Sequence, residues 1–442
     1  MPLSNVFAIS IALNTVRAGA QSLGIPLIAA TGITTEIPSG EVRAVATTDD
    51  LEALGFENTD PVWLAFESMV GQDDVSNGAS PASVYIGSRA TPVAQVATYS
   101  IPASPTDGNY VATINGVACT FAASSSTQTQ VRDGLLAAIN ASTQAPFVTA
   151  TSGSGTVVVT SDQAGRPFSA TATSPSSSMT LAATTANVGF YDDLDDFADY
   201  VRTNALSPIY GVTEVSRLDA AIIEGARWCA SANNAFLPQS DDSGIPVQAT
   251  TTDIASQLRT LGHARTSLAY KSNDTHYLAE AVAGKLLAKV PGTYNPAWQV
   301  VSTAADILTQ TQATAIAGKR ANYCETIGGD TVYFFGRTSS GTFIDLIVAR
   351  DDLDLAINNS LADLLKSEDI VPLDEPERLG ANIEATIRSK AYVVPGTVVV
   401  DVPSYAEIPL NDRSNRNVPS ITFSAVVRQG INTATVTGSL TL

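Results

Sequence analysis

Hydrophobic and polar positions alternate at both ends of the chain. From 434 to 442, every second position is apolar or glycine, and the positions between are Thr or Ser. Residues 5–13 also alternate. A period of two is typical of a β-strand with one apolar face. The pattern predicts a strand at each end, with apolar faces formed by Phe7, Ile9, Ile11, Leu13, Ala434, Val436, Leu440 and Leu442.

The C-terminal strand contains no charge or proline that would protect its edge. Two interpretations follow from this. The strand pairs within its own domain, for which residues 421–425 and a turn at 428–430 supply a hairpin partner. Alternatively, its edge pairs with another molecule, as an unprotected edge strand allows. The pattern alone leaves both open, and we predict pairing with neighbouring molecules for both ends.

Residues 1–94 predict mixed structure. The apolar run at 24–30 predicts a buried strand, and residues 83–86 predict a second one. Helices are expected from Thr48, with acidic residues in its first turn, and from Pro61. We therefore assign 1–94 to an N-terminal arm followed by the first part of a core.

Residues 95–188 differ in composition, since they carry only five charged side chains. Strands on either side of Asn115-Gly116, a helix at 128–140 and three further strands give the order ββαβββ. Ser/Thr/Pro/Gly-rich segments at 102–108 and 174–178 lie near its ends. We interpret this stretch as a small inserted β-rich domain on the outer surface.

Residues 189–390 alternate between helix and strand patterns, which predicts an α/β layer with a largely parallel sheet. One of the expected strands is at 343–348 and one of the helices at 351–365. Residues 391–442 are expected to be entirely β. The fold class is therefore α/β: a mixed α/β sandwich core with β-rich terminal arms and the inserted domain.

The composition of the chain argues against some classes of function. The chain has 44% hydrophobic and 15% charged residues and a net charge of −19, which argues against nucleic acid as a partner. Three widely spaced cysteines provide no disulfide framework. We expect no signal peptide and no membrane segment, and hence a cytoplasmic setting.

Catalytic and metal motifs are not recognisable. The two histidines, His263 and His276, are isolated in sequence, and we interpret each as a helix-end residue. We interpret the aspartates at 192–196 and at 351–354 as residues in the first turns of two helices, where the helix dipole stabilises negative charge. No spacing identifies a nucleophile with its base. We expect no catalytic residues, no cofactor and no metal.

Several loose motifs carry a family resemblance. They are Asn322 to Gly329, Phe335 to Asp345, Pro291-Gly292-Thr293 followed by Trp298, and Arg413 and Arg416 before Pro419 to Phe423, then Ile431, Val436 and Gly438. In these the chain resembles the tail sheath proteins of contractile bacteriophages. The resemblance covers about residues 1–94 and 189–442, and the stretch 95–188 departs from it.

The resemblance implies a structural subunit that polymerises as stacked hexameric rings around a tail tube and contracts to drive the tube through the host envelope. The implied partners are further copies of itself, the tube protein, and baseplate and terminator proteins, with no nucleic acid and no membrane. It implies assembly in the host bacterial cytoplasm and a final place in the virion tail. Terminal strands that join the sheets of neighbouring subunits suit an open helical assembly.

Other classes remain as alternatives. One is a different tail-like structural protein, either a tail tube or the sheath of a contractile injection system. Another is an α/β enzyme, such as a hydrolase or transferase, with an inserted domain. A third is a cell-surface adhesin, suggested by the Ser/Thr-rich β stretch but not by any secretion signal.

Overall fold

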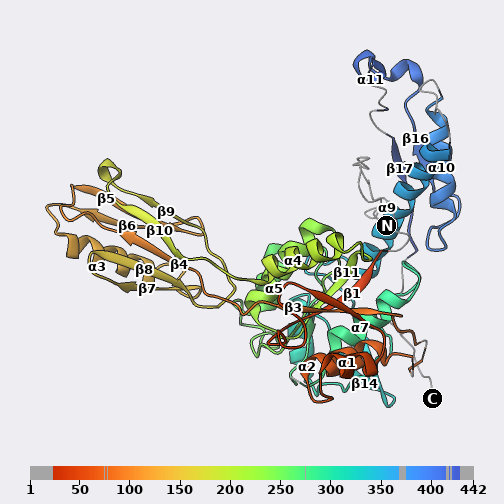
Figure 1. Ribbon diagram of the computed structural model, residues 1–442, viewed down its shortest axis with the longest axis horizontal. Helices are drawn as coiled ribbons and strands as arrows, with labels where there is room; N and C mark the ends of the chain where they lie inside the picture. Colours follow the sequence, from red (N-terminus) through yellow and green to blue (C-terminus); the bar gives the residue numbers. More distant parts are fainter. Residues whose placement is uncertain are drawn as a thin grey trace, which may run out of the picture.

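The computed structural model describes residues 23–73, 75–76, 78–273, 275–367, 375–414, 418 and 421–428. Figure 1 shows a central α/β core, a β-rich lobe that projects from one side, and a narrow C-terminal lobe that rises from the core. The mixed α/β class predicted from the sequence is confirmed. The projecting lobe is formed by the insert, and the C-terminal lobe by the residues from the middle of α9 onward.

A four-stranded sheet forms the centre of the core. Its strands are β1 (Ile25–Thr31), β2 (Val42–Val45), β3 (Val84–Arg89) and β11 (Ile209–Glu214), in the order β11-β1-β3-β2. β1 is parallel to both β3 and β11, whereas β2 is antiparallel to β3. Residues 26–30 of β1 are all buried, as expected for a parallel strand that is covered on both faces.

Further segments extend this sheet beyond β11. Phe236 forms parallel bridges to Val212 of β11 and to Thr266. Two short parallel strands follow, β12 (Gln239–Ser240) and β13 (Ala269–Tyr270). Ala269 then bridges Asn322, next to the antiparallel hairpin of β14 (Tyr323–Ile327) and β15 (Asp330–Phe334). The result is the largely parallel layer predicted from the helix–strand alternation.

Helices cover both faces of the sheet. One face carries α1 (Thr48–Leu54), α2 (Pro61–Val70) and α7 (Leu278–Ala288), whose apolar side chains pack on Ile28 and Ile86. The other face carries α4 (Phe190–Thr203), α5 (Asp219–Ala232), α6 (Ile254–Leu261) and α8 (Gln310–Gly318), which pack on Leu27, Ala29 and Val212. Alternate residues of β1 thus supply two separate cores.

The insert has a hydrophobic core of its own, which includes Tyr99, Tyr110, Leu135 and Val159. One sheet has the order β10-β4-β8-β7 and the other β6-β5-β9. The strands and helices are β4 (Val96–Ser100), β5 (Gly108–Ile114), β6 (Val117–Ala123), α3 (Gln128–Asn140), β7 (Val148–Ser152), β8 (Thr156–Ser161), β9 (Ala170–Thr173), a 3₁₀ turn (Pro175–Ser177) and β10 (Thr180–Thr185).

The insert therefore has one strand more at each end than the predicted order ββαβββ. β4 and β10 pair with each other in antiparallel register. Most of β10 is exposed, so it lacks the apolar alternation by which a strand is recognised. The hairpin at Asn115-Gly116 is as expected, because both residues have positive φ, 49° and 81°.

The C-terminal lobe consists of two helices against two strands. They are α9 (Ile344–Ser367), α10 (Glu377–Arg388), β16 (Val399–Asp401) and β17 (Thr422–Ser424). The predicted strand at 343–348 is wrong, since α9 begins at Ile344. An entirely β tail is also wrong, since a 3₁₀ turn (Tyr405–Glu407) and α11 (Leu410–Ser414) lie between the two strands.

Candidate functional site

The predicted terminal strands lie outside the described residues. This applies to Phe7, Ile9, Ile11, Leu13, Ala434, Val436, Leu440 and Leu442. Pairing of these strands with neighbouring molecules stays a prediction. The described surface closest to the C-terminal segment in sequence is the sheet of β16 and β17.

β16 and β17 form a short sheet with one covered face. Val400 pairs with Phe423, and both pack on the hydrophobic cluster that α9 and α10 share. On the opposite face Val399 is 61% exposed. In the described part of the chain no further strand pairs with either of them. A two-stranded sheet with open edges is a favourable place for an added strand.

α9 joins this lobe to the core. Its 24 residues span about 36 Å. Ile344, Ile347 and Val348 belong to the core cluster that packs on β1 and β3. Leu353, Ile357 and Leu361 belong to the cluster of the C-terminal lobe. One continuous helix is thus anchored at one end in the core and at the other in the lobe.

Asp351 fixes α9 to the core. The two terminal guanidinium nitrogens of Arg265 donate to the two oxygens of its carboxylate, Nη2 to Oδ1 at 2.8 Å, and the Tyr210 hydroxyl donates to Oδ2 at 2.9 Å. The Arg265 and Asp351 side chains are 7% and 10% exposed. Burial, followed by the charge of Asp351, raises the pKa of Tyr210. A buried bidentate ion pair with a third hydrogen-bond donor fixes the orientation of α9 on the core as well as its contact with the core.

Asp352 fixes the same helix to the C-terminal lobe. Its Oδ2 accepts from Lys390 Nζ at 2.7 Å and from the Tyr392 hydroxyl at 2.8 Å. Consecutive helical residues point about 100° apart, so adjacent aspartates reach different partners. The expectation that residues 351–354 form a first helical turn is wrong, because α9 begins seven residues before Asp351. Asp351 and Asp352 instead lie inside the helix and pair with Arg265 and Lys390, which lie outside it.

A buried charge cluster lies at the carboxyl ends of β3 and β11. Arg89 donates to Asp193 at 3.0 Å and also to Glu214. Glu214 accepts from the backbone N–H of Arg217 at 3.1 Å. Glu280 is 1% exposed, and its Oε2 has no hydrogen-bond partner. Burial is the main reason that the pKa of Glu280 rises to about 7. Two arginines thus face three carboxyl groups, so one carboxyl is in excess.

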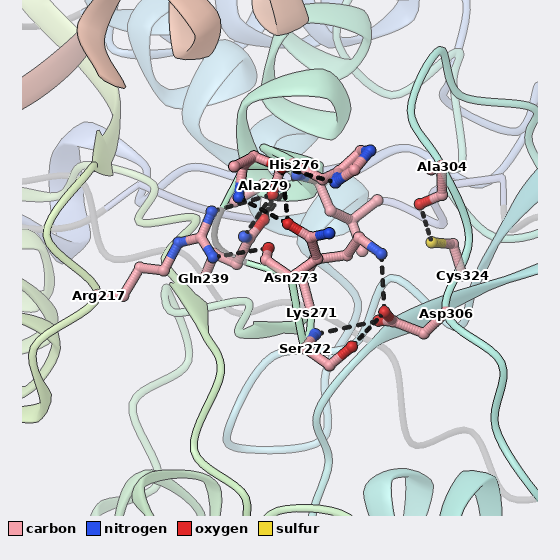
Figure 2. A network of polar contacts seen from close by, with 12 residues as sticks. Arg217, Gln239, Lys271, Ser272, Asn273, His276, Ala279, Ala304, Asp306 and Cys324 are labelled. Carbon is pink, nitrogen blue, oxygen red and sulfur yellow. Dashed lines mark hydrogen bonds and ion pairs between the residues drawn. The ribbon is translucent and has the colours of Figure 1, made fainter. Parts of the chain in front are cut away.

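Figure 2 shows the polar contacts that hold the loop between β13 and α7, among them those of Arg217. Arg217 donates to the carbonyls of Asn273 and His276, at 2.9 and 3.0 Å. Gln239 donates to the same His276 carbonyl at 2.7 Å and accepts from the N–H groups that begin α7. Lys271 pairs with Asp306 at 2.8 Å. The loop is therefore held on one side through its backbone carbonyls and on the other through the side chain of Lys271.

A half-open cavity of about 450 Å³ lies where β1 and β11 end. In parallel sheets this edge, between strands whose connections run in opposite directions, is a common ligand position. Its lining includes Thr31, Glu36, Asp60, Arg217 and Tyr277, and holds neither histidine nor cysteine. Among the described residues no group of three metal-ligating side chains occurs. The described helices include none that is long and apolar enough to cross a membrane.

Sequence reasoning missed these ion-pair residues. Their signal in the sequence was a charged residue beside an apolar run: Arg89 is the last residue of the buried strand β3, and Arg265 precedes the buried segment 266–270. In a chain with few charges such positions are informative, because buried charges require partners. The partners themselves, at 193, 214 and 351, are too distant in sequence to be identified from spacing.

The fold is similar to that of a contractile sheath over nearly the whole chain. The sheath of an extracellular contractile injection system, PVC, in its contracted state aligns with 99% of this chain and 98% of its own length, at a TM-score of 0.50 and 8% identity. The sheath tail protein of Desulfitobacterium hafniense aligns with 86% of this chain and 91% of its own, at a TM-score of 0.43 and 11% identity. No family model and no curated protein sequence matches.

Proposed function

We propose that this chain is the structural subunit of a contractile sheath. The observation that carries the proposal is the fold shared with the injection-system sheath along essentially the full length of both chains. The finer proposal is that the sheath belongs to a bacteriophage tail, as the sequence motifs imply. The role is mechanical, and no catalytic step is assigned to it.

The path of α9 supports a mechanical role. A subunit that rotates during contraction has to transmit force between the surfaces that hold its neighbours. Asp351 and Asp352 bind the helix to the core and to the C-terminal lobe respectively. These contacts couple the helix to both parts, and in this proposal a load on the lobe reaches the central sheet through α9.

The terminal strands provide the links between subunits in this proposal. We assign the open edges of β16 and β17 as the place where a terminal strand of a neighbouring copy adds. Backbone hydrogen bonds supply the affinity, and the alternation of apolar side chains fixes the register. Contacts of this head-to-tail kind generate an open helical polymer.

The proposed function also assigns a role to each part of the chain. The proposed division is an N-terminal arm and first part of the core in 1–94, the main core in 189–390, and a C-terminal segment and arm in 391–442. The second half of α9 and α10, although within 189–390, pack in the C-terminal lobe. The insert, 95–188, lies on the outer surface. Within the assembly we propose hexameric rings of this chain, an inner tube protein, and baseplate and terminator proteins at the ends.

Negative-stain microscopy of the purified chain tests the general proposal. We expect long tubes or stacked rings, with ring-to-ring repeats along the axis. A single small oligomer at every concentration, with no polymer when the tube protein is co-expressed, would contradict it.

Gold-labelled antibody against the chain, applied to particles from a producing culture, tests the finer proposal. Gold along tails attached to DNA-filled heads supports a phage. Gold on headless sheaths alone assigns the chain to an injection system.

A further inference from the structure

The half-open cavity at the carboxyl ends of β1 and β11 has no part in the sheath assignment. Its volume of about 450 Å³ is within the range of small-molecule sites. Ala30, Phe56, Val62 and Tyr277 of its lining belong to the hydrophobic cluster that α2 and α7 form on one face of the sheet. Since this edge of a parallel sheet commonly binds ligands, the chemistry of the lining indicates which class of ligand fits.

One part of the lining is apolar. Ile33, Phe56 and Val62 are buried, and Val215 packs against the same hydrophobic cluster. Walls of this kind accept the carbon chain of a ligand and leave its recognition to the polar groups around them.

Three carboxyl groups from separate segments complete the lining. Glu36 follows β1, Asp60 precedes α2 and Asp241 follows β12. Glu36 and Asp60 are half-buried, and Asp241 is exposed. Over the described part of the chain, no lysine or arginine forms an ion pair with any of the three. Their negative charge is therefore not balanced by a neighbouring cation of the described chain.

Arg217 is the basic residue of the lining, and its charge is directed into the protein. Its guanidinium donates to the carbonyls of Asn273 and His276 at 2.9 and 3.0 Å (Figure 2). The same group attracts the buried Glu280. Three carboxylates thus line the cavity with one guanidinium that is already engaged, so negative charge is in excess.

Two buried oxygens without hydrogen-bond partners lie next to this lining. Glu280 Oε2 is in the first turn of α7, three residues after Tyr277, and Glu280 is 1% exposed. Ser88 Oγ is on β3, where Ser88 is in register with Ala30 of β1, so the two side chains share one face of the sheet. Buried oxygens normally have partners, so this end of the core lacks hydrogen-bond donors.

The arrangement does not suit a metal ion or an anion. A metal ion needs several ligands that converge on one point, and no group of three such side chains occurs among the described residues. An anion would be attracted by the N-terminus of α2, which carries about half a positive charge. Asp60 lies at that same helix end, however, and the three carboxylates together outweigh the dipole.

We propose that this cavity binds an organic cation, in the form of an ammonium or guanidinium group on a short aliphatic chain. The charged group lies among the carboxylates of Glu36, Asp60 and Asp241, and the carbon chain packs on Phe56 and Val62. Side chains of lysine and arginine bury their aliphatic stems in the same way. A dissolved polyamine and a basic side chain of a second copy share this chemistry. The proposal does not depend on the sheath assignment.

Titration calorimetry of the full chain with agmatine tests the proposal. Agmatine carries a guanidinium and an ammonium group on a four-carbon chain. We expect saturable binding to one site, about tenfold tighter than that of methylguanidinium, because the longer carbon chain buries more apolar surface. Glutarate, a dianion of similar length, is expected not to bind. Saturable binding of glutarate in place of agmatine, or no saturation with agmatine below about 10 mM, would overturn the proposal.

Sedimentation of the full chain with and without agmatine distinguishes the two sources of the cation. If a basic side chain of a second copy occupies the cavity, excess agmatine competes with it and self-association falls. If the ligand is a dissolved cation, agmatine binds and self-association is unchanged. Each result supports binding at the same cavity, because both require that agmatine saturates it.

Two double variants with the same change in charge locate the site. Asp60→Asn with Asp241→Asn is expected to weaken agmatine binding about tenfold. Asparagine at position 60 can still accept the N–H of Glu57, so the start of α2 is retained. Glu67→Gln with Asp73→Asn removes two exposed acids from the other end of α2 and should leave the affinity unchanged.

Circular dichroism establishes that both double variants are folded. If the folded Asp60→Asn, Asp241→Asn variant binds agmatine as tightly as the wild type, the proposal is overturned. It is also overturned if both double variants weaken binding equally, because the cation is then attracted by the net charge of −19 and not by the cavity.

Discussion

Glu280 shows how one residue sets a property of the core. It lies in the first turn of α7, buried beside Glu214, and Arg217 only partly offsets the cost of its charge. A glutamate with a pKa of about 7 is mostly neutral below that pH. Since the group is neutral in the folded state but ionised in the unfolded chain above pH 5, it makes folding depend on pH.

Glu280→Gln is expected to remove that dependence. A raised pKa means that the stabilising contribution is present below the ordinary pKa of 4.5 and is lost as pH rises through about 7. Relative to the variant, the wild-type free energy of unfolding should fall by about 2–3 kcal/mol between pH 5 and pH 8. Urea unfolding curves at both pH values measure this.

The exposed Glu67 of α2 provides the matched control for that measurement. Glu67→Gln should follow the wild type at both pH values. If Glu280→Gln also follows the wild type, Glu280 is ionised in the folded protein, and the excess carboxyl has to be sought elsewhere in the cluster.

Gly284 of α7 allows this helix to pack closely against α2. A Cβ at this position would lie 1.9 Å from the backbone oxygen of Met69 in α2. α2 and α7 therefore pack at a distance that only glycine permits. The sequence context, Gly284-Lys285-Leu286, gave no indication of this, since the contact is made by a helix more than two hundred residues away.

At the scale of elements, α9 is the helix that joins the core to the C-terminal lobe. We expect Asp351→Asn to destabilise the protein by about 3–5 kcal/mol, because it leaves the buried Arg265 without its carboxylate. Asp352→Asn should cost less, about 1 kcal/mol, because Asp352 and Lys390 are about one-fifth exposed. Denaturant unfolding compares the two, and hydrogen exchange along α9 shows which end loosens. Equal losses would mean that the two contacts do not differ in the way their burial indicates.

The terminal strands are the second prediction at this scale. In the free subunit we expect rapid amide exchange at both ends, and in the polymer strong protection. Each interchain hydrogen bond contributes about 1 kcal/mol, so several form together. Thr435→Pro removes one donor and should weaken assembly while leaving the core folded. Strong protection of both ends in the monomer would show that they pair within their own subunit.

The sequence predicted several elements, including the buried strands β1 and β3, but it could not distinguish a buried helix from a buried strand where apolar residues were continuous. The bounds 128–140 for α3 were found because its capping residues and apolar spacing agree. Residues 343–348 were mistaken for a strand because Ile344, Leu346, Ile347 and Val348 are all buried, so neither helical nor strand periodicity is visible. β10 failed for the opposite reason, since it is mostly exposed.

The ion pairs of the candidate site could not be predicted from the sequence, because their partners are far apart along the chain. The sequence predicted arms, which are local patterns. It did not predict the pairing of Arg265 with Asp351, or of Arg89 with Glu214, since each depends on how the sheet brings remote segments together. Interactions of this kind become visible only once the strand order β11-β1-β3-β2 is known.

At the scale of the whole molecule, the insert is the part whose removal is most informative. Val93 and Val188 already lie side by side, so replacing residues 95–187 with a short Gly/Ser turn should leave the core intact. We expect the shortened chain to fold and still to form tubes, because we place the insert on the outer surface. Circular dichroism and negative-stain microscopy measure these two outcomes. A folded but monomeric product would place the insert in the assembly contact.

The closeness of Val93 and Val188 also bears on how the chain reaches its fold. β3 and β11 flank β1, yet about 120 residues separate them in sequence, and the insert makes up most of that interval. A folded insert shortens the effective loop between β3 and β11 from about 120 to roughly 25 residues, which lowers the entropic cost of closure by about 1 kcal/mol. During synthesis the insert emerges before β11, α4 and α5. Its early folding would hold β3 close to the point where β11 joins the sheet, so that the insert assists closure of the core during synthesis.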